Sequence, residues 1–415
     1  MTGTAIAERL AELLSPAVGG ELPVRLTAWD GSVAGPVDAP KVTLHSANVL
    51  RRLLWNPGEL GAAQAYVLGE LDVDGDLGEA LTHVWKVSAE RGLGPVTPTP
   101  SVILAAVRAA RSLGMFGRPL PPPVSQARVK GRLHSVSRDR AAIGHHYDLS
   151  NDFYSLILDE NMAYSSGYWT SDAPDYTLDD SQKDKLDLVC RKIGLDRARG
   201  QRLLDVGCGW GSLSVHAAHK YGAHVVGVTI SAEQKAFVDA RIQSLGLEDR
   251  VEVRLQDYRE ITDGPYDAVA SIEMGEHVGE DNYPTYVKAL HDNVVEGGRV
   301  LIQQMSRTGA HPGGGPFIES FIAPDMYMRP VGRTVAMIEE GGLEVRDVQA
   351  LREHYVRTVD AWIETFESNF DRVVELVGVE VARVWRLYLV GGGMAFRDGR
   401  MGVDQILSVR PSCLR

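Results

Sequence analysis

The sequence predicts an α/β protein with a Rossmann-like sheet of seven strands in its C-terminal part and a smaller α+β unit before it. Two observations support this prediction. From Gln201 onward, short apolar runs alternate with amphipathic stretches, which indicates parallel βαβ units. A glycine-rich turn, Gly207–Gly211, separates a predicted strand from a predicted helix. The 415 residues suffice for more than one domain with its own core.

Residues 1–118 are predicted to form the smaller, N-terminal domain. Met1–Ala17 has the apolar spacing of a short amphipathic helix. Two strands and two helices follow, at Pro23–Trp29, Lys41–His45, Ala47–Trp55 and Leu60–Leu68. The acidic segment Asp72–Asp76 lacks the spacing and terminal glutamate of a calcium loop, so a solvated turn is expected there.

Residues 119–140 are predicted to be a linker between two domains, and residues 141–415 the second domain. Pro119–Pro123 favours an extended chain. Between Arg108 and Arg140 all charged residues but one are basic, including Arg128, Lys130 and Arg132. Such a segment could attract an anionic membrane surface or a lipid headgroup. A solvated basic linker explains the same composition.

Seven strands are predicted in the second domain. They are Gln201–Val206, His224–Thr229, Arg250–Gln256, Tyr266–Ile272, Arg299–Gln304, Leu343–Ala350 and Gln405–Val409. Ligands of such sheets bind beyond the carboxyl ends of the strands. A binding site is therefore expected where these strands end.

Composition excludes several classes of function. The net charge of −12 argues against nucleic acid as the main partner, since phosphate binding needs a basic surface. The three cysteines, Cys190, Cys208 and Cys413, lie far apart and show no metal-ligand spacing, so no metal site is predicted. Met1–Ala17 lacks the features of a signal peptide, and no apolar run is long enough to span a bilayer. A cytoplasmic protein with reduced thiols is expected.

The glycine turn carries the first functional prediction. Gly207, Gly209 and Gly211 allow the backbone to approach a ligand closely, and their spacing differs from the dinucleotide fingerprint. The turn resembles the nucleoside-binding loop of class I S-adenosylmethionine-dependent methyltransferases. The resemblance implies that Asp205 faces the amino-acid end of that cofactor. A plain glycine turn in an unrelated α/β domain is the alternative.

Further cofactor contacts are expected at the ends of the next two strands. Thr229, Ser231 and Gln234 stand where most such enzymes hold the ribose hydroxyls. Ser231 and Gln234 also fit a helix N-cap with its capping-box partner, and both roles are compatible. Asp257 and Tyr258 occupy the usual position of adenine contacts.

Five motifs in order resemble the cyclopropane-fatty-acid synthase family, which includes the mycolic acid methyltransferases. They are Gly144–Tyr154 (GHHYDLSNDFY), Met162–Trp169 (MAYSSGYW), Gly207–Gly211 (GCGWG), Thr229–Gln234 (TISAEQ) and Glu276–Gly279 (EHVG). The resemblance covers most of residues 140–410, and the N-terminal domain resembles the lipid-handling domain of the phospholipid-acting members. It implies methyl or methylene transfer to the cis double bond of an unsaturated fatty acyl chain. The expected carrier is a phospholipid, reached peripherally at the inner face of the membrane.

The resemblance also implies site residues. Tyr147, Tyr164 and Ser165 join the cofactor-binding set. In cyclopropane synthases a bound bicarbonate acts as base, held by a glutamate, a tyrosine, a cysteine and a histidine. Glu276 and Tyr355 match the glutamate and the tyrosine, whereas Ser166 and Gln303 replace the cysteine and the histidine. His277 completes the catalytic set. Glu276 could instead cap the next helix or hold His277.

These replacements leave bicarbonate binding open and bear on the product. With an incomplete cage, the carbocation on the acyl chain should persist, and a hydride shift before proton loss gives a methylene branch. A cyclopropane, a small-molecule or sterol-like substrate, and a non-catalytic lipid-binding role are the alternatives. No redox cofactor motif is visible, so saturation to a methyl branch would need a separate reductase. The sequence leaves open whether two copies form a homodimer.

Overall fold

A computed structural model describes residues 5–16, 18–93, 117–127, 150–309 and 313–412. The chain divides into two compact units. The first comprises Met1–Gln126 and Val377–Met394, and the second comprises Ala127–Leu376 and Ala395–Arg415. Tyr147, Arg128, Lys130 and Arg132 lie outside the described residues.

The first unit contains a small sheet of four strands in the order β2-β1-β3-β4. Its elements are α1 (Ile6–Leu14), β1 (Arg25–Thr27), β2 (Val33–Ala34), β3 (Lys41–Leu44), α2 (Asn48–Trp55), α3 (Glu59–Val67), β4 (Leu71–Val73) and α4 (Leu77–Glu90). Leu10, Leu26 and Val49 meet in its core, so α1, β1 and α2 are packed together. The predicted turn at Asp72–Asp76 is wrong in part, because Asp72 pairs with Thr43 in the sheet. Asp76 caps α4 by accepting a hydrogen bond from the amide of Glu79.

One segment from the C-terminal part of the chain joins this first unit. It is the middle of the long helix α15 (Phe370–Arg397), which is broken at Gly378 by a φ of 80°. The guanidinium of Arg383 donates to the carbonyls of Tyr66 and Leu71 and pairs with Asp72. It also lies 4.1 Å from the centre of the Tyr66 ring. These contacts explain why Val377–Met394 does not group with the rest of the predicted range 141–415.

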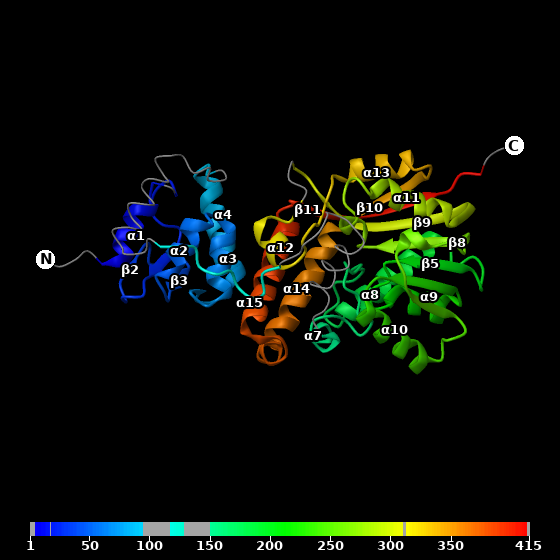
Figure 1. Ribbon diagram of the computed structural model, residues 1–415, viewed down its shortest axis with the longest axis horizontal. Coiled ribbons are helices and arrows are strands. Elements are labelled where there is room, and N and C mark those ends of the chain that lie inside the picture. The colour runs from blue at the N-terminus through cyan, green and yellow to red at the C-terminus, as the bar shows by residue number, and fades with distance from the viewer. Residues whose placement is uncertain (1–4, 17, 94–116, 128–149, 310–312, 413–415) are drawn as a thin grey trace. The chain divides into compact units, whose positions relative to one another are not determined.

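The second unit is built on a seven-stranded sheet in the order β10-β11-β9-β8-β5-β6-β7 (Figure 1). The strands are β5 (Arg202–Val206), β6 (His224–Thr229), β7 (Val251–Leu255), β8 (Tyr266–Ile272), β9 (Val294–Arg307), β10 (Glu344–Ala350) and β11 (Met401–Val409). The helices are α7 (Asn151–Ser155), α8 (Leu178–Ile193), α9 (Ser212–Tyr221), α10 (Ala232–Leu245), α11 (Tyr283–Asp292), α12 (Pro316–Phe321), α13 (Val331–Glu340) and α14 (Arg352–Ser368). The short 3₁₀ helices η1 (Tyr258–Glu260) and η2 (Gly275–His277) follow β7 and β8.

Two apolar layers enclose this sheet. Helices α8, α9 and α10 pack on one face through residues such as Leu186, Leu213 and Val238. Helices α11 and α13 pack on the other face through residues such as Tyr286 and Ile338. Because both faces are covered, the central strands are apolar on both sides, which made them visible in the sequence.

The fold prediction is confirmed. All seven predicted strands are present, and two of them, at His224–Thr229 and Tyr266–Ile272, have the predicted bounds. The expectation of parallel units throughout is wrong at one edge, where β11 runs antiparallel to both β9 and β10. An antiparallel edge can be formed without a helical crossover, and alternating patterns alone do not specify strand direction.

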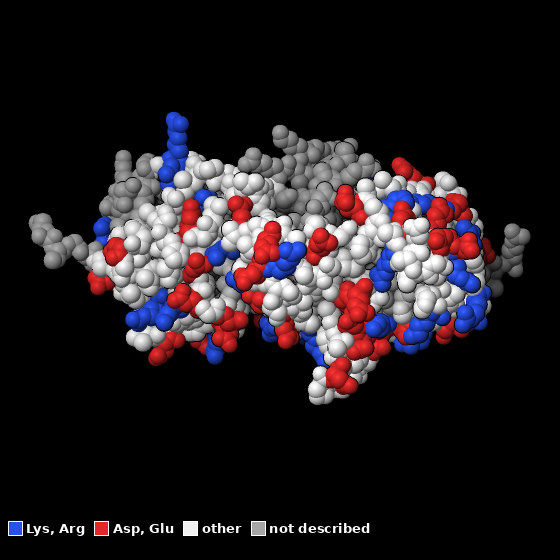
Figure 2. Space-filling view, turned by 90° about the horizontal axis from the view of Figure 1, so that it is seen from below, with Lys and Arg blue, Asp and Glu red and all other residues white. Residues whose placement is uncertain are grey.

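The described residues also bear on the membrane and metal expectations. None of their helices is long and apolar enough to cross a membrane. Within the same residues no cluster of potential ligands could hold a metal ion. Cys190 and Cys208 are free and buried. Acidic and basic side chains are intermingled on the face shown in Figure 2.

Candidate functional site

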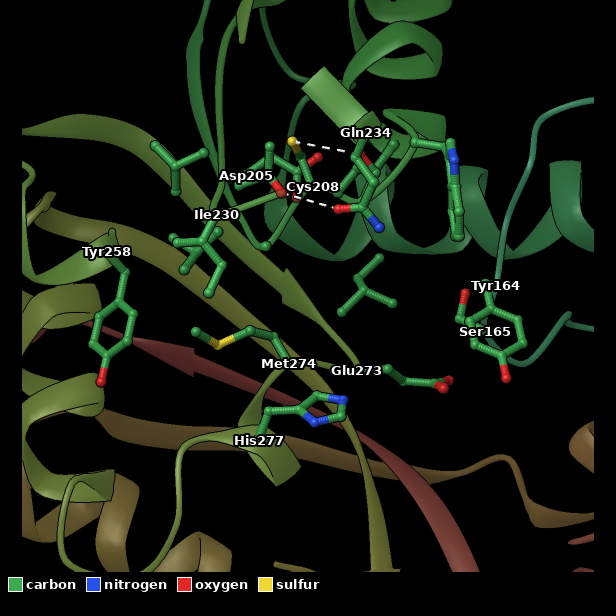
Figure 3. A pocket seen from close by; sticks show the side chains of 18 of the residues that line it. Tyr164, Ser165, Asp205, Cys208, Ile230, Gln234, Tyr258, Glu273, Met274 and His277 are labelled. Carbon is green, nitrogen blue, oxygen red and sulfur yellow. Dashed lines mark hydrogen bonds between the residues drawn. The ribbon is translucent and has the colours of Figure 1, made fainter. Parts of the chain in front are cut away.

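A cavity lies at the carboxyl ends of β5, β6, β7 and β8, where the sheet order predicts a ligand site (Figure 3). Most of the expected cofactor residues line it. These are Tyr164, Ser165, Asp205, Gly207, Gly209, Thr229, Gln234, Asp257 and Tyr258. His277 also lines the cavity. Gly211 and Ser231 are not among the described residues that line it.

The glycine turn shapes one wall of the cavity. Gly207, Gly209 and Gly211 all have positive φ, so the turn suits glycine at each position. A Cβ on Gly209 would meet no atom within 4 Å, which shows that this glycine borders open space. A Cβ on Gly211 would instead lie 2.7 Å from Val238, so Gly211 permits close packing of the turn against α10.

Asp205 places a buried carboxylate at the end of β5. It is 2% exposed, and its Oδ2 accepts a hydrogen bond of 2.7 Å from Ser214 on α9. Burial raises the pKa of Asp205 to about 6, although the Ser214 hydrogen bond and the Lys185 ammonium act in the opposite direction. The cavity therefore contains an acidic group that a cationic ligand would favour in its ionised form.

The polar residues after β6 are held by one another. Thr229 Oγ1 donates a hydrogen bond of 2.9 Å to Gln234 Oε1 (Figure 3). This contact fixes the orientation of the Gln234 side-chain amide. Ser231 accepts a hydrogen bond from the Gln234 backbone and caps α10. The structure thus shows the N-cap role of Ser231, whereas Thr229 and Gln234 face the cavity.

Asp257 and Tyr258 border the far end of the cavity. Asp257 accepts two hydrogen bonds of 2.7 Å from the Arg259 side chain, one on each carboxylate oxygen. Tyr258 packs edge-on against Tyr286 with 5.7 Å between ring centres. These contacts hold an acidic side chain and an aromatic ring at the same end of the cavity.

A buried lysine supports the segment that carries Tyr164 and Ser165. Lys185 on α8 is fully buried and donates to Ser165 Oγ over 2.9 Å. Gln182, one turn earlier, donates to the carbonyls of Ala163 and Ser165. Burial lowers the pKa of Lys185 to about 8, opposed by the negative charges of Asp159, Glu273 and Asp205. Helix α8 thereby fixes the part of the cavity wall that Tyr164 and Ser165 form.

Glu273, directly after β8, was not among the predicted site residues, yet three of them meet at its carboxylate. Oε1 accepts hydrogen bonds of 3.0 Å from the Ser166 amide and 3.0 Å from Gln303 Nε2. Oε2 accepts a hydrogen bond of 2.8 Å from the Tyr355 hydroxyl. Glu273 is partly buried and lines the cavity, where its side chain points towards Tyr164 and Ser165 (Figure 3).

Glu276, a predicted catalytic residue, is buried close enough to Glu273 for their charges to interact. It is fully buried, is not among the described residues that line the cavity, and accepts a hydrogen bond from the Met305 amide over 3.3 Å. Its Oε2 has no hydrogen-bond partner among the described residues. Burial, together with the charge of Glu273, raises the pKa of Glu276 to about 8. Burial therefore favours the protonated form of Glu276, and it also raises the pKa of Glu273, where three accepted hydrogen bonds counteract the rise.

Ser166 and Gln303, two other predicted catalytic residues, both donate hydrogen bonds to Glu273. The Ser166 hydroxyl donates to the Gly167 carbonyl, so only the Ser166 amide reaches Glu273. Gln303 is fixed from its other side, because its Oε1 accepts a hydrogen bond of 3.0 Å from Gln405. The sequence signal for Glu273 was available, since it is an acidic residue at the carboxyl end of a predicted strand. The three donors to it come from distant segments and could not be assembled from spacing.

Aromatic rings continue from Glu273 along the second unit. Tyr355 lies 4.4 Å from Phe396 and 5.9 Å from Trp362, between ring centres. Trp362 in turn lies 5.3 Å from Tyr164, which lines the cavity. Tyr355 thus connects the Glu273 carboxylate to a group of aromatic rings, whose faces can stabilise a positive charge.

Sequence comparisons place the chain among known lipid enzymes. The family profile described as "Mycolic acid cyclopropane synthetase" matches residues 134–406. A "Probable fatty acid methyltransferase" of Pseudomonas putida is 37% identical over 97% of this chain and 95% of its own length. The "Tuberculostearic acid methyltransferase UfaA1" of Mycobacterium tuberculosis is 33% identical over 98% of this chain and 91% of its own length.

Structural comparison agrees. The mycolic acid cyclopropane synthase CmaA1, solved with SAH and CTAB, superposes with a TM-score of 0.61 at 31% identity, covering 65% of this chain and 98% of that one. The cavity suits S-adenosylmethionine, since it combines an open glycine turn, a buried carboxylate and polar groups at successive strand ends. The fold, the cavity and these matches together identify the chain as a member of the mycolic acid cyclopropane synthetase family, the S-adenosylmethionine-dependent methyltransferases that act on lipids.

Proposed function

We propose that this enzyme transfers a one-carbon unit to the cis double bond of an unsaturated fatty acyl chain in a phospholipid, and that the product is a methylene-branched chain. S-adenosylmethionine supplies an electrophilic methyl group when it is bound. In this proposal Asp205 faces the amino-acid end of the cofactor, Thr229 and Gln234 hold the ribose, and Asp257 and Tyr258 contact the adenine. Each of these residues lines the cavity.

The observation that carries the proposal is the continuity between the cofactor cavity, Glu273 and the aromatic rings around Tyr355. Methylation of a double bond leaves a positive charge on the acyl chain. Aromatic faces and an anionic group stabilise such a positive charge. Water in the same place would add to the carbocation and end the reaction. A site for methyl transfer to oxygen or nitrogen would not need this combination.

The branched product is preferred over a cyclopropane because of the relatives that share the whole chain. The relatives matched over 97% and 98% of the chain are named for fatty acid and tuberculostearic acid methylation. The solved cyclopropane synthase CmaA1 covers 65% of the chain. In both reactions the new carbon joins the double bond. A hydride shift before proton loss gives the methylene branch, whereas direct ring closure gives the cyclopropane, which is the second candidate.

The proposal is tested with the purified chain, vesicles of oleoyl phospholipid and S-adenosylmethionine. The released fatty acids are analysed by gas chromatography–mass spectrometry before and after ozonolysis, which cleaves a methylene branch and leaves a cyclopropane intact. We expect chiefly an ozone-sensitive product that carries one additional carbon. A dominant ozone-resistant product would overturn the branching proposal and leave the family assignment standing.

A further inference from the structure

We propose that Glu273 is the catalytic base that removes the proton from the methylated acyl chain, and that it takes the place of a bound bicarbonate. The inference rests on the proposed function, because it assigns the proton-transfer step of that reaction to one side chain.

The hydrogen bonds around Glu273 carry the inference. Three donors reach its carboxylate from separate parts of the chain, namely the Ser166 amide, Gln303 Nε2 and the Tyr355 hydroxyl. Both carboxylate oxygens are engaged, and the side chain still lines the cavity. A bicarbonate ion would need these same donors, and they are already satisfied by the protein's own carboxylate. The residues present therefore do not fit a separate bicarbonate.

The backbone at Glu273 has an unusual conformation that serves this placement. Its φ is 50°, in the left-handed region that residues other than glycine rarely adopt. The conformation is held at the end of β8 by a hydrogen bond of 2.6 Å from the Glu273 amide to the Gln303 carbonyl. Backbone strain of this kind persists where the surrounding structure determines it and gathers at functional sites.

Charged groups on α8 and η2 act on Glu273 in opposite directions. The Lys185 ammonium on α8 lowers the pKa of Glu273, and it also interacts with the carboxylates of Asp205 and Asp159. Glu276, from η2, adds a repulsive charge only when it is ionised, and its own pKa is raised to about 8. Burial raises the pKa of Glu273, and the three hydrogen bonds and Lys185 counteract this increase. The pKa of Glu273 therefore lies above its ordinary value, which makes its carboxylate a stronger base.

The proposed step is balanced. The double bond forms a bond to the transferred methyl carbon, and S-adenosylhomocysteine leaves as a neutral thioether. After the hydride shift, a C–H bond of the new methyl group breaks and its electron pair becomes the methylene double bond. The proton passes to a carboxylate oxygen of Glu273 and from there to solvent between turnovers. No oxidant or reductant is required.

The test compares turnover in bicarbonate-depleted buffer with turnover after bicarbonate is added, using the full chain. The turnover of the wild type in the two buffers should differ by less than twofold. Glu273→Gln should lower product formation by about 10²- to 10⁴-fold, the usual contribution of a general base, and should retain cofactor binding by calorimetry. Glu339→Gln, an exposed carboxylate on α13, is the matched control and should keep wild-type turnover.

Two results would overturn the inference. One is a wild type that loses activity when bicarbonate is removed, and this measurement needs no variant to fold. The other is a Glu273→Gln protein that makes product at the wild-type rate. Release of S-adenosylhomocysteine is measured alongside product identity. The wild type could instead make a product other than the methylene-branched chain without bicarbonate, and Glu273→Gln could fail to make it. That outcome would contradict the proposed function while supporting the role of Glu273.

Discussion

Among single residues, the site depends on a few positions where a small change in a side chain should alter cofactor binding or stability. Gly209 borders the open cavity and has a φ of 54°. Asp205 is buried at the end of β5 with a raised pKa. These two positions lead to two predictions, one on cofactor binding and one on stability.

Gly209→Val should weaken cofactor binding strongly in a protein that still folds. The added side chain would project into space that the cofactor backbone needs, and valine is also strained at this φ. We expect the affinity for S-adenosylmethionine to fall at least tenfold, which is about 1.4 kcal/mol. Isothermal calorimetry and a circular dichroism melt provide the measurement and its folding control. An unchanged dissociation constant would refute the assignment of the cavity.

Asp205→Asn should change the pH dependence of stability in the cofactor-free protein. The pKa of Asp205 is raised to about 6 in the fold, so the folded state holds its proton more tightly than the unfolded state does. The associated stability is present below about pH 4 and lost as pH rises through 6, which amounts to roughly 3 kcal/mol at most. The variant should therefore be more stable than the wild type at pH 8 and similar to it near pH 4. Urea titrations at both pH values test this, and parallel pH profiles would contradict it.

At the scale of elements, helix α8 links the cofactor wall to Glu273. Gln182 and Lys185 hold the segment that includes Ser165, and the next amide, that of Ser166, donates to Glu273. The same ammonium acts electrostatically on Asp205 and Glu273. A change in α8 should therefore affect binding and proton transfer together.

Lys185→Met should move the acidic limb of the kcat profile to higher pH. Without the buried ammonium, the pKa of Glu273 rises further, and a smaller fraction is ionised at a given pH. We expect a shift of about one pH unit. Lys185→Arg should restore the limb towards its wild-type position. Lys183→Met, an exposed lysine on the same helix, is the control. If the limb stays in place in a folded Lys185→Met protein, α8 has no part in tuning the base.

Most elements of the large sheet could be predicted from the sequence, whereas the contacts around Glu273 could not. Alternating apolar runs located all seven strands of the large sheet, because burial on both faces leaves a strong local pattern. The glycine turn and its flanking elements were likewise visible locally. The set of hydrogen bonds to Glu273 was not predicted. Its three donors come from residues 166, 303 and 355, which are far apart in the sequence, and the orientation of Glu273 depends on one positive φ. The place of Val377–Met394 in the first unit depends on Arg383, whose partners lie more than 300 residues earlier in the chain.

At the scale of the whole molecule, an acidic protein must reach a lipid substrate. The net charge is −12, yet the charged residues between Arg108 and Arg140 are nearly all basic. We propose that this stretch brings the enzyme to an anionic membrane surface. The described residues contain no helix that could span the membrane.

Charge reversal of Arg128, Lys130 and Arg132 should weaken binding to anionic vesicles and leave cofactor affinity unchanged. Each basic residue near an anionic surface contributes about 1 kcal/mol, and salt screens the attraction. Vesicle sedimentation over a salt series measures the effect, with zwitterionic vesicles as the reference. Binding that is insensitive to salt, or equal in the variant, would count against the proposal.

The central claim, that the newly transferred methyl group loses a proton to form a methylene branch, is tested most directly by isotope labelling. The enzyme is given oleoyl phospholipid and S-adenosylmethionine with a trideuterated methyl group, and the product is examined by mass spectrometry. We expect the added carbon to retain two of its three deuterium atoms and the ozone-sensitive double bond to lie at that carbon. A product that retains all three deuterium atoms would show that the proton leaves from another carbon, and would rule out a methylene branch formed from the transferred methyl group.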